Sequence, residues 1–368
     1  MPAYDALVLV SFGGPEGRDD VLPFLRNVTA GRNVPDSRLA EVAEHYHQFG
    51  GVSPINQQCR DLLDAIEKDL ASAGIDLPVY WGNRNWHPFL EDTLVTMAAD
   101  GVSRALAFCT SAYSSYSSCR QYLEDIARAR VAAGPRAPQV DKIKPYFGHP
   151  AFAGSFAAAA RAAVGSLPAE VRADADLVFT AHSIPESMSE RSGPDGGAYP
   201  AQLARVAAAV AAQAGSTRPW RLAYSSRSGP PSQPWLVPDI NDCLAELARA
   251  GSRAVVAVPV GFVSDHMEVR FDLDVEAAQT ARRLGLPFAR AATPGTSPQF
   301  VAMITDLVRE YQALPASAPA GPAVTAAANG SGPPGLAPDA SWPSPADLAA
   351  CCYSGCCIPA PRRPQASR

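Results

Sequence analysis

Residues 6–12 read Ala-Leu-Val-Leu-Val-Ser-Phe and lead directly into Gly13-Gly14-Pro15. A short apolar run that ends in a glycine turn is typical of a buried strand. Further runs of this kind lie at residues 79–82, 104–109, 177–181, 221–224 and 254–260. Because helical patterns separate these runs, the sequence predicts an α/β fold in which helices cover parallel sheets.

The strand and helix pattern runs twice along the chain. We expect one α/β unit at residues 1–145 and a second at 146–314, which opens with an alanine-rich helix at 150–165. Residues 315–347 are dominated by Pro, Ala and Gly, a composition that predicts a flexible linker. Residues 348–368 form a tail that is rich in cysteine.

The composition excludes several classes of protein. The 368 residues are 47% hydrophobic and 18% charged, as in soluble globular proteins. With 31 Lys+Arg against 36 Asp+Glu, the net charge of −5 provides no basic field for nucleic acid. No apolar stretch approaches the ~18 residues of a membrane span, and the N-terminus lacks the features of a secretory signal. We therefore expect a cytoplasmic protein without an integral membrane segment.

Ionisable residues follow two of the predicted strands. The apolar run at 177–181 is followed by His182. Open α/β sheets bind ligands at the carboxyl ends of their strands, although a histidine there can also be an ordinary loop residue. After the run at 254–260, Glu268, Asp272 and Glu276 are spaced to form one row on a helix. Such a row is commonly a solvated acidic face. Beside a strand end and opposite a histidine, however, it suits a divalent cation such as Fe²⁺.

Cysteines form a second candidate site. Four of them lie close together in the tail: Cys351, Cys352, Cys356 and Cys357. Zinc and iron–sulfur centres both accept thiolates, and incidental thiols are the alternative. If the tail supplies only part of the ligand set, Cys119 is the best candidate in the body, because it opens a predicted helix whose N–H groups favour a thiolate. Three further cysteines lie in apolar patterns and are expected in the core: Cys59, Cys109 and Cys243.

Several motifs together resemble those of one family. They lie at residues 11–16, 50–54, 82–88, 116–119, 181–185, 226–235 and 262–268, and include Ala-His-Ser-Ile-Pro and Asp-His-Met-Glu. Over residues 4–312 the chain resembles the ferrochelatases, most closely the coproporphyrin ferrochelatases of actinobacteria. The resemblance implies two Rossmann-like domains with a porphyrin cleft between them. It also implies a lyase that inserts Fe²⁺ into coproporphyrin III, releases two protons and yields coprohaem for haem biosynthesis.

The resemblance also assigns residues. It implies that His182 and Glu268 are catalytic and bind the metal from opposite sides of the porphyrin, and that Asp272 and Glu276 form an acidic path for metal or protons. Porphyrin contacts are implied for Ser53, Tyr122, Arg32 and Phe12, and Arg26 lies in the same segment as Arg32. Many coproporphyrin-type enzymes carry a tyrosine at the position of Phe12, and a phenyl ring cannot ligate haem iron.

Some ferrochelatases hold a [2Fe–2S] cluster with one internal and three tail cysteines. The resemblance implies Cys119 as the internal ligand and three of Cys351, Cys352, Cys356 and Cys357 as the others. The implied partners are the porphyrin, the coprohaem product and a downstream haem-pathway enzyme, and we expect a monomer. Three alternatives remain open: a protoporphyrin IX ferrochelatase, a cobalt or nickel chelatase, and a non-catalytic haem-binding or redox-sensing protein on the same fold.

Overall fold

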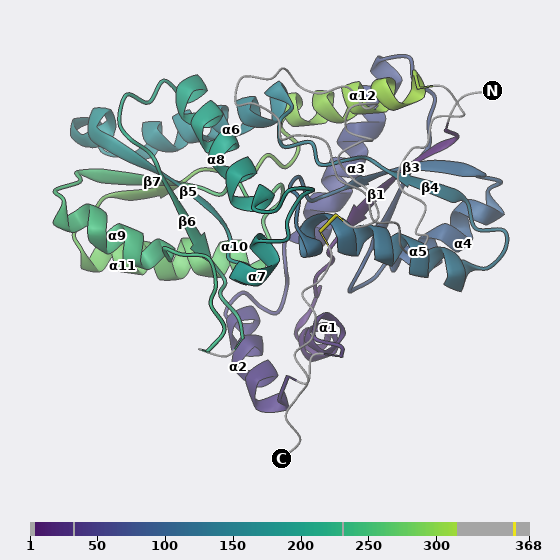
Figure 1. Ribbon diagram of the computed structural model, residues 1–368, viewed down its shortest axis with the longest axis horizontal. Coiled ribbons are helices and arrows are strands. Elements are labelled where there is room, and N and C mark those ends of the chain that lie inside the picture. The colour runs from purple at the N-terminus through teal and green to yellow at the C-terminus, as the bar shows by residue number, and fades with distance from the viewer. Residues whose placement is uncertain (1–3, 32–33, 230–231, 315–355, 358–368) are drawn as a thin grey trace.

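Two parallel sheets form the frame of the protein (Figure 1). The computed structural model describes residues 4–31, 34–229, 232–314 and 356–357. Within these ranges the first sheet has the order β2-β1-β3-β4 and the second the order β6-β5-β7-β8. The strands are β1 Ala6–Ser11, β2 Val79–Asn83, β3 Arg104–Cys109, β4 Gln139–Lys142, β5 Ala175–His182, β6 Arg221–Ser225, β7 Ala254–Val258 and β8 Phe288–Arg290. The predicted α/β class with parallel sheets is confirmed.

Helices cover both faces of each sheet. The helices of the first half are α3 Ile55–Ser72, α4 Leu90–Ala99 and α5 Gln121–Ala133, together with α1 Val21–Val28 and α2 Asp36–His47, which do not cover a sheet. In the second half they are α6 Pro150–Ser166, α7 Glu186–Ser189, α8 Ala198–Ala214, α9 Ile240–Arg249, α10 Met267–Val269, α11 Ala278–Arg283 and α12 Pro298–Gln312. The helix predicted to begin at Cys119 and the helix predicted for the acidic row both contain π-helical segments, Tyr116–Arg120 and Arg270–Ala277. The second of these segments carries two residues of the acidic row.

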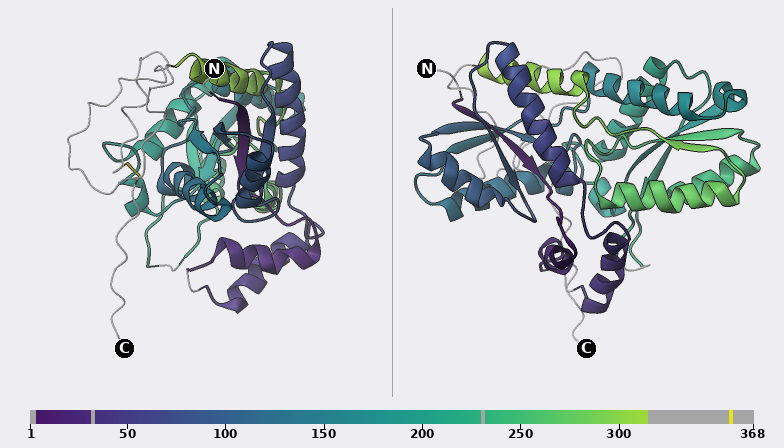
Figure 2. Two further views of the ribbon diagram at one scale, coloured as in Figure 1. Left: turned by 90° about the vertical axis from the view of Figure 1, so that its right-hand side faces the viewer. Right: turned by 180° about the vertical axis from the view of Figure 1, so that it is seen from behind.

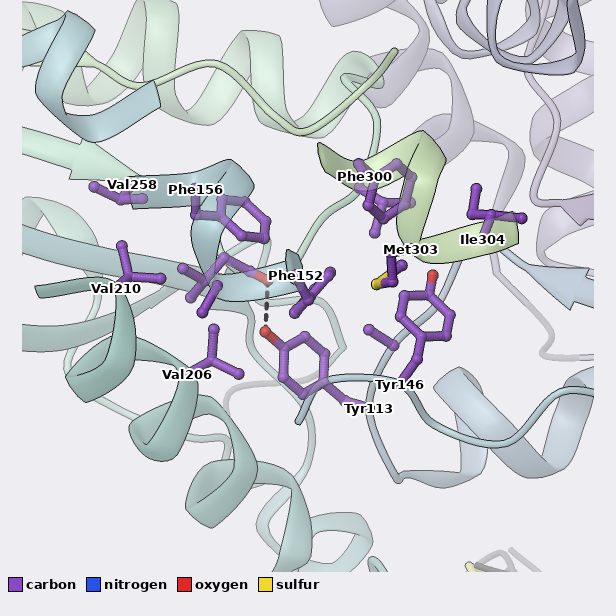
Figure 3. Packing of buried hydrophobic residues seen from close by; sticks show 14 of the residues in the cluster. Tyr113, Tyr146, Phe152, Phe156, Val206, Val210, Val258, Phe300, Met303 and Ile304 are labelled. Carbon is purple, nitrogen blue, oxygen red and sulfur yellow. Dashed lines mark hydrogen bonds between the residues drawn. The ribbon is translucent and has the colours of Figure 1, made fainter. Parts of the chain in front are cut away.

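One hydrophobic core joins the two halves. Side chains on successive strand residues point to opposite faces, so Leu7 and Leu9 of β1 enter this core, as do Leu177 and Phe179 of β5. Figure 3 shows its centre, where aromatic rings from both halves pack together. There the Tyr113 hydroxyl donates a 2.7 Å hydrogen bond to the Val260 carbonyl. The halves therefore share a packed interior.

Helix α12 ties the end of the second half to the first. It packs against both α3 and α6, as Figure 2 shows from behind. Its Thr305 hydroxyl donates to the Asp69 carboxylate on α3, and its Tyr311 hydroxyl accepts a 3.1 Å hydrogen bond from the Lys144 amide. Residues 298–312 thus pack against both halves of the protein.

Helices α1 and α2 stand apart from the sheets, below them in Figure 1. They pack on each other through Phe24 and Tyr46, whose ring centroids lie 6.0 Å apart. Met267, the residue before Glu268, is buried in the same apolar cluster. The pair of helices therefore reaches across to the segment that carries the acidic row.

Candidate active site

His182 is the last residue of β5, and its ring is held in one orientation. Its Nδ1 contacts the Ser183 carbonyl oxygen, and the Tyr199 hydroxyl donates a 3.0 Å hydrogen bond to the His182 carbonyl. Because a carbonyl oxygen only accepts, Nδ1 carries the proton of the neutral ring and Nε2 is the free base. The side chain is 33% exposed, so this base is open to a ligand.

Glu268 lies opposite this base. Its Oε2 is 3.7 Å from His182 Nε2 and 3.9 Å from His266 Nδ1. No macrocycle fits between atoms this close, so the expectation that His182 and Glu268 lie on opposite sides of the porphyrin is wrong: both groups lie on one side of the site. Burial lowers the pKa of His266, and the charge of Glu268 opposes that shift. Sequence reasoning assigned no role to His266, although it stands two residues before Glu268 in the same motif. The site therefore holds two histidines around one carboxylate.

A glycine allows this approach. Gly261 follows β7, and a Cβ placed there would lie 2.6 Å from both Cα and Cβ of Ala181, the residue before His182. The Gly261 amide also donates a 3.0 Å hydrogen bond to the Thr180 carbonyl. The loop that leads to Glu268 thus crosses the end of β5 in direct contact with its backbone.

The acidic row continues from Glu268 along the π-helical segment. Burial raises the pKa of Asp272 to about 7, the Ser226 hydroxyl bonded to it opposes this, and the charge of Glu268 adds to it. Burial also raises the pKa of Glu276, against the charge of His45. His45 stacks on Phe271 with ring centroids 3.8 Å apart. The row therefore leads from the His182 pair towards α2.

Ser226, which contacts Asp272, has a strained backbone conformation. Its φ of 61° lies in the left-handed region, which costs a residue with a side chain about 1–2 kcal/mol. The hydroxyl of this strained residue donates to the Asp272 carboxylate. Strain at a residue bonded to a titratable group is a pattern of functional sites.

Segments of the first half meet the Glu268 segment directly. The Asp265 amide donates a 2.8 Å hydrogen bond to Gln58 Oε1 on α3. Burial and then the charge of Glu268 raise the pKa of Tyr46 on α2. These contacts place the acidic row at the junction of the two halves.

Phe12 follows β1 and is 36% exposed. Its ring packs edge-on against Phe24 at 6.3 Å between centroids. The Arg84 guanidinium lies 5.6 Å from the Phe12 ring and 4.6 Å from the Tyr122 ring, and it pairs with the buried Asp125. Arg84 lies in the motif at 82–88, but sequence reasoning gave it no role. Phe12 is thus an open aromatic surface backed by a fixed cation.

Two other expected porphyrin contacts of the first half, Tyr122 and Ser53, are buried. Tyr122 and Ser53 are each only 4% exposed, Tyr122 under Arg84 and Ser53 beside the β1 turn. A Cβ on Gly14 would lie 2.6 Å from the Ser53 Cβ, so this turn requires glycine. Arg26 is an exposed residue of α1, 3.8 Å from Asp36. Arg32 lies outside the described residues.

The cysteines divide into two groups. Burial raises the pKa of each of three thiols to about 11, as expected for core residues: Cys59, Cys109 and Cys243.

The second group contains the expected cluster ligands. Cys119 is 5% exposed, and the Lys142 ammonium lies 3.7 Å from its sulfur. Cys357 Sγ accepts a 3.1 Å hydrogen bond from the Gly193 amide and lies 3.6 Å from Cys356 Sγ. Cys351 and Cys352 lie outside the described residues.

The described part of the chain contains no group of three His, Cys, Asp or Glu side chains placed to hold a metal ion. Within the same ranges no helix is long and apolar enough to span a bilayer.

Comparison with known proteins identifies the family. A model of the ferrochelatase family matches residues 4–312. The chain belongs to the ferrochelatase family. Ferrochelatase relatives include the coproporphyrin III ferrochelatase of Frankia alni, 52% identical over 99% of this chain and 89% of its own length. That of Streptomyces coelicolor is 55% identical over 83% of this chain and 85% of its own. The family predicted from the motifs is confirmed.

Solved structures support the chelatase fold of this ferrochelatase. DR2241 of Deinococcus radiodurans, described as similar to chelatases, matches with a TM-score of 0.52 at 17% identity, over 83% of this chain and 55% of its own. SirB of Bacillus subtilis with Fe³⁺ matches with a TM-score of 0.50 at 14% identity, over 84% of this chain and 95% of its own. At these identities the likeness concerns the fold alone.

Proposed function

We propose that this ferrochelatase inserts Fe²⁺ into coproporphyrin III and gives coprohaem for haem biosynthesis. The observation that carries the proposal is the pairing of the free Nε2 of His182 with Glu268 at 3.7 Å. Relatives that are more than half identical over most of the chain are named coproporphyrin III ferrochelatases. The enzyme is a lyase that forms metal–nitrogen bonds.

The chemistry requires a base and a route for protons. Two pyrrole N–H bonds break, Fe²⁺ forms bonds to the ring nitrogens, and two protons leave, so that charge is conserved. His182 Nε2 accepts a proton at the centre of the macrocycle, and Glu268 stands next in line. Asp272, with a pKa of about 7, accepts and releases protons near neutrality. Glu276 then leads the protons towards α2.

The first half holds the macrocycle in this proposal. Phe12 offers its exposed ring to the porphyrin face, and binding energy there supports the distortion that opens the pyrrole nitrogens. Ser53 and Tyr122 are the further contacts proposed in this half, although each is only 4% exposed. The four carboxylates of coproporphyrin take Arg32 and Arg26 as partners, because guanidinium matches a carboxylate in plane.

The identity of the porphyrin substrate is tested by comparing turnover of the two candidate porphyrins. Turnover of Fe²⁺ is measured under anaerobic conditions with coproporphyrin III and with protoporphyrin IX. We expect kcat/KM to favour coproporphyrin III at least tenfold, which corresponds to about 1.4 kcal/mol. A preference for protoporphyrin IX contradicts the proposed substrate. Haem binding without turnover of either porphyrin contradicts an enzymatic role.

We further propose that Cys119 and three of the four tail cysteines hold a [2Fe–2S] cluster. The thiols in view fit such a group, because Cys119 and Cys357 are buried and their sulfurs meet a lysine and a backbone N–H. Such contacts stabilise the negative charge of cluster thiolates. When bound, the cluster supplies a one-electron redox centre there.

Visible spectra and iron and sulfide analysis of anaerobically purified protein test the cluster. The wild type should show absorption bands between about 300 and 600 nm and acid-labile sulfide. Cys119→Ser should lose both, whereas Cys243→Ala, which alters a core thiol, should keep them. A colourless wild type without sulfide contradicts the cluster.

The domain bounds, the cellular location and the oligomeric state are also part of the proposal. We propose domains at residues 1–145 and 146–314, a linker at 315–347 and a cluster-binding tail at 348–368. We also propose a cytoplasmic monomer that passes coprohaem to a downstream haem-pathway enzyme. Separation by size with light scattering tests the monomer.

A further inference from the structure

One arginine fastens both ends of the segment that carries Glu268. Arg290 ends β8, and its guanidinium contacts Asp265 and Asp274 together. Towards Asp265, Nη1 and Nη2 donate hydrogen bonds of 3.1 and 2.9 Å to the two carboxylate oxygens. Towards Asp274, Nε and Nη2 donate hydrogen bonds of 2.5 and 3.2 Å. A single side chain therefore makes two bidentate ion pairs, one on each side of Glu268.

The clamp is shielded from water. The side chains of Arg290 and Asp265 are 15% and 12% exposed, and that of Asp274 is 28% exposed. Thr293, three residues after Arg290, adds a 3.0 Å hydrogen bond from its hydroxyl to Asp265 Oδ1. Shielded bidentate pairs of this kind are both strong and geometrically specific. The two anchor points are therefore fixed with respect to β8.

Glu268 itself has weaker support. Its side chain is 49% exposed, and its 3.7 and 3.9 Å distances to His182 and His266 exceed hydrogen-bond length. Its place opposite His182 therefore depends on how the backbone from 265 to 274 is held. The π-helical segment with Asp272 begins at Arg270, within the same clamped stretch.

We infer that Arg290 is a positioning residue of the iron-insertion reaction. It fixes the segment so that Glu268 faces His182 and Asp272 continues the row, and it touches neither porphyrin nor iron. This inference rests on the catalytic role proposed for Glu268. Lysine keeps the charge at this position but lacks the planar fork that binds two carboxylates at once. The substitution Arg290→Lys therefore breaks the double clamp while preserving the net charge. Asp274 keeps its 2.8 Å ion pair with Arg270, but Arg270 belongs to the same segment and does not tie it to β8.

A matched control lies elsewhere in the second half. Arg218 also makes a bidentate pair, with bonds of 2.7 and 3.2 Å to the buried Asp176, and that carboxylate additionally accepts from the Ser252 hydroxyl. Asp176 lies in β5 near its start, at the opposite end of the strand from His182. Arg218→Lys therefore measures what the same change costs away from the site.

The test compares both variants in stability and in steady-state kinetics. We expect Arg290→Lys to lower kcat at least tenfold while the porphyrin KM changes less than twofold. Arg218→Lys should leave both within twofold. Equal kcat values for Arg290→Lys and the wild type, or equal losses in the two lysine variants, overturn the inference. If Arg290→Lys does not fold, Thr293→Val loosens one anchor alone and should lower kcat with an unchanged porphyrin KM; a wild-type kcat in that variant overturns the inference too.

A double variant separates this inference from the proposed function. If Arg290 acts through Glu268, then Arg290→Lys adds no more than a twofold loss to the residual turnover of Glu268→Gln. A further loss of tenfold contradicts action through Glu268. If Glu268→Gln alone keeps wild-type turnover, the proposed catalytic role of Glu268 is wrong. If Glu268→Gln is inactive but Arg290→Lys has wild-type turnover, only the inference about Arg290 is wrong.

Discussion

The two sheets share one strand order, but their strands end in different chemistry. In the second half, β5 ends at His182 and the chain after β7 carries Glu268. In the corresponding positions of the first half, β1 is followed by Phe12 and a glycine turn, and β3 by Thr110. The same frame thus presents ionisable groups from one side and an aromatic, hydroxyl-bearing surface from the other. The difference supports the proposal that the second half carries the proton and metal chemistry and the first half binds the porphyrin.

The largest effects should come from the second half. His182→Ala and Glu268→Gln each remove a group that we propose to exchange protons, and losses of this kind lower kcat by about 10²–10⁴-fold. Porphyrin binding, measured by fluorescence quenching, should change only a few-fold in both variants. Near-normal turnover in either variant, or loss of porphyrin binding with it, breaks the division between the halves.

The chemistry of the second half should also have a cost in stability. The pKa of Asp272 is about 7 in the folded protein, against about 3.9 for a free carboxyl. Between these values the native state binds more protons than the unfolded state, so the free energy of unfolding falls as pH rises from about 4 to about 7. Above pH 7 the whole cost, up to about 4 kcal/mol, is present.

Asp272→Asn removes this titration, since an amide stays neutral. Urea denaturation should therefore show the variant to be more stable than the wild type at pH 8, with the difference shrinking towards pH 5. Asp306→Asn, which breaks an exposed ion pair with Arg309, serves as the control and should show no such pH trend. A constant difference between Asp272→Asn and the wild type across this range refutes a raised pKa.

The smallest effect should come from the first half. Phe12→Ala removes an exposed ring that we propose to contact the porphyrin face, and such a contact contributes about 1–1.5 kcal/mol to binding. The porphyrin KM should therefore rise about 5–10-fold, and kcat should stay within twofold of the wild type. Val131→Ala, at an 82% exposed apolar residue of α5, should change neither constant. A fall in kcat without a change in KM for Phe12→Ala shows that the first half takes part in the chemical step.

The sequence predicted the central strands well because they are continuous apolar runs. All six residues of β1 and all five of β7 are buried, so their pattern is unambiguous. The sequence analysis did not predict β4, which reads Gln-Val-Asp-Lys, or β8, which has only Phe-Ala-Arg. Both strands lie at sheet edges, where polar residues are tolerated, so neither has a continuous apolar pattern. The π-helical turns were also missed, because the same acidic spacing fits an α-helix.

The sequence also predicted part of the candidate site, because some of its residues stand close to the ends of predicted strands. His182 and Glu268 follow strand ends, and the topology of parallel sheets brings such ends to one edge. Arg290 gave no signal, since it stands 25 residues from Asp265 and nothing in the spacing connects the two. The coupling of Tyr46 to Glu268 was equally hidden, because it depends on how α2 packs across to the other half.

The crossing of α12 has a consequence for synthesis. This helix covers α3, yet it follows every described strand of the protein in the sequence. While the nascent chain is still growing, α3 can pack on β1 and β2, but the part of α3 that α12 covers stays exposed until residues 298–312 are made. The protein should therefore leave the ribosome as one cooperative unit, and a chain interrupted before residue 298 should need a chaperone to stay out of aggregates.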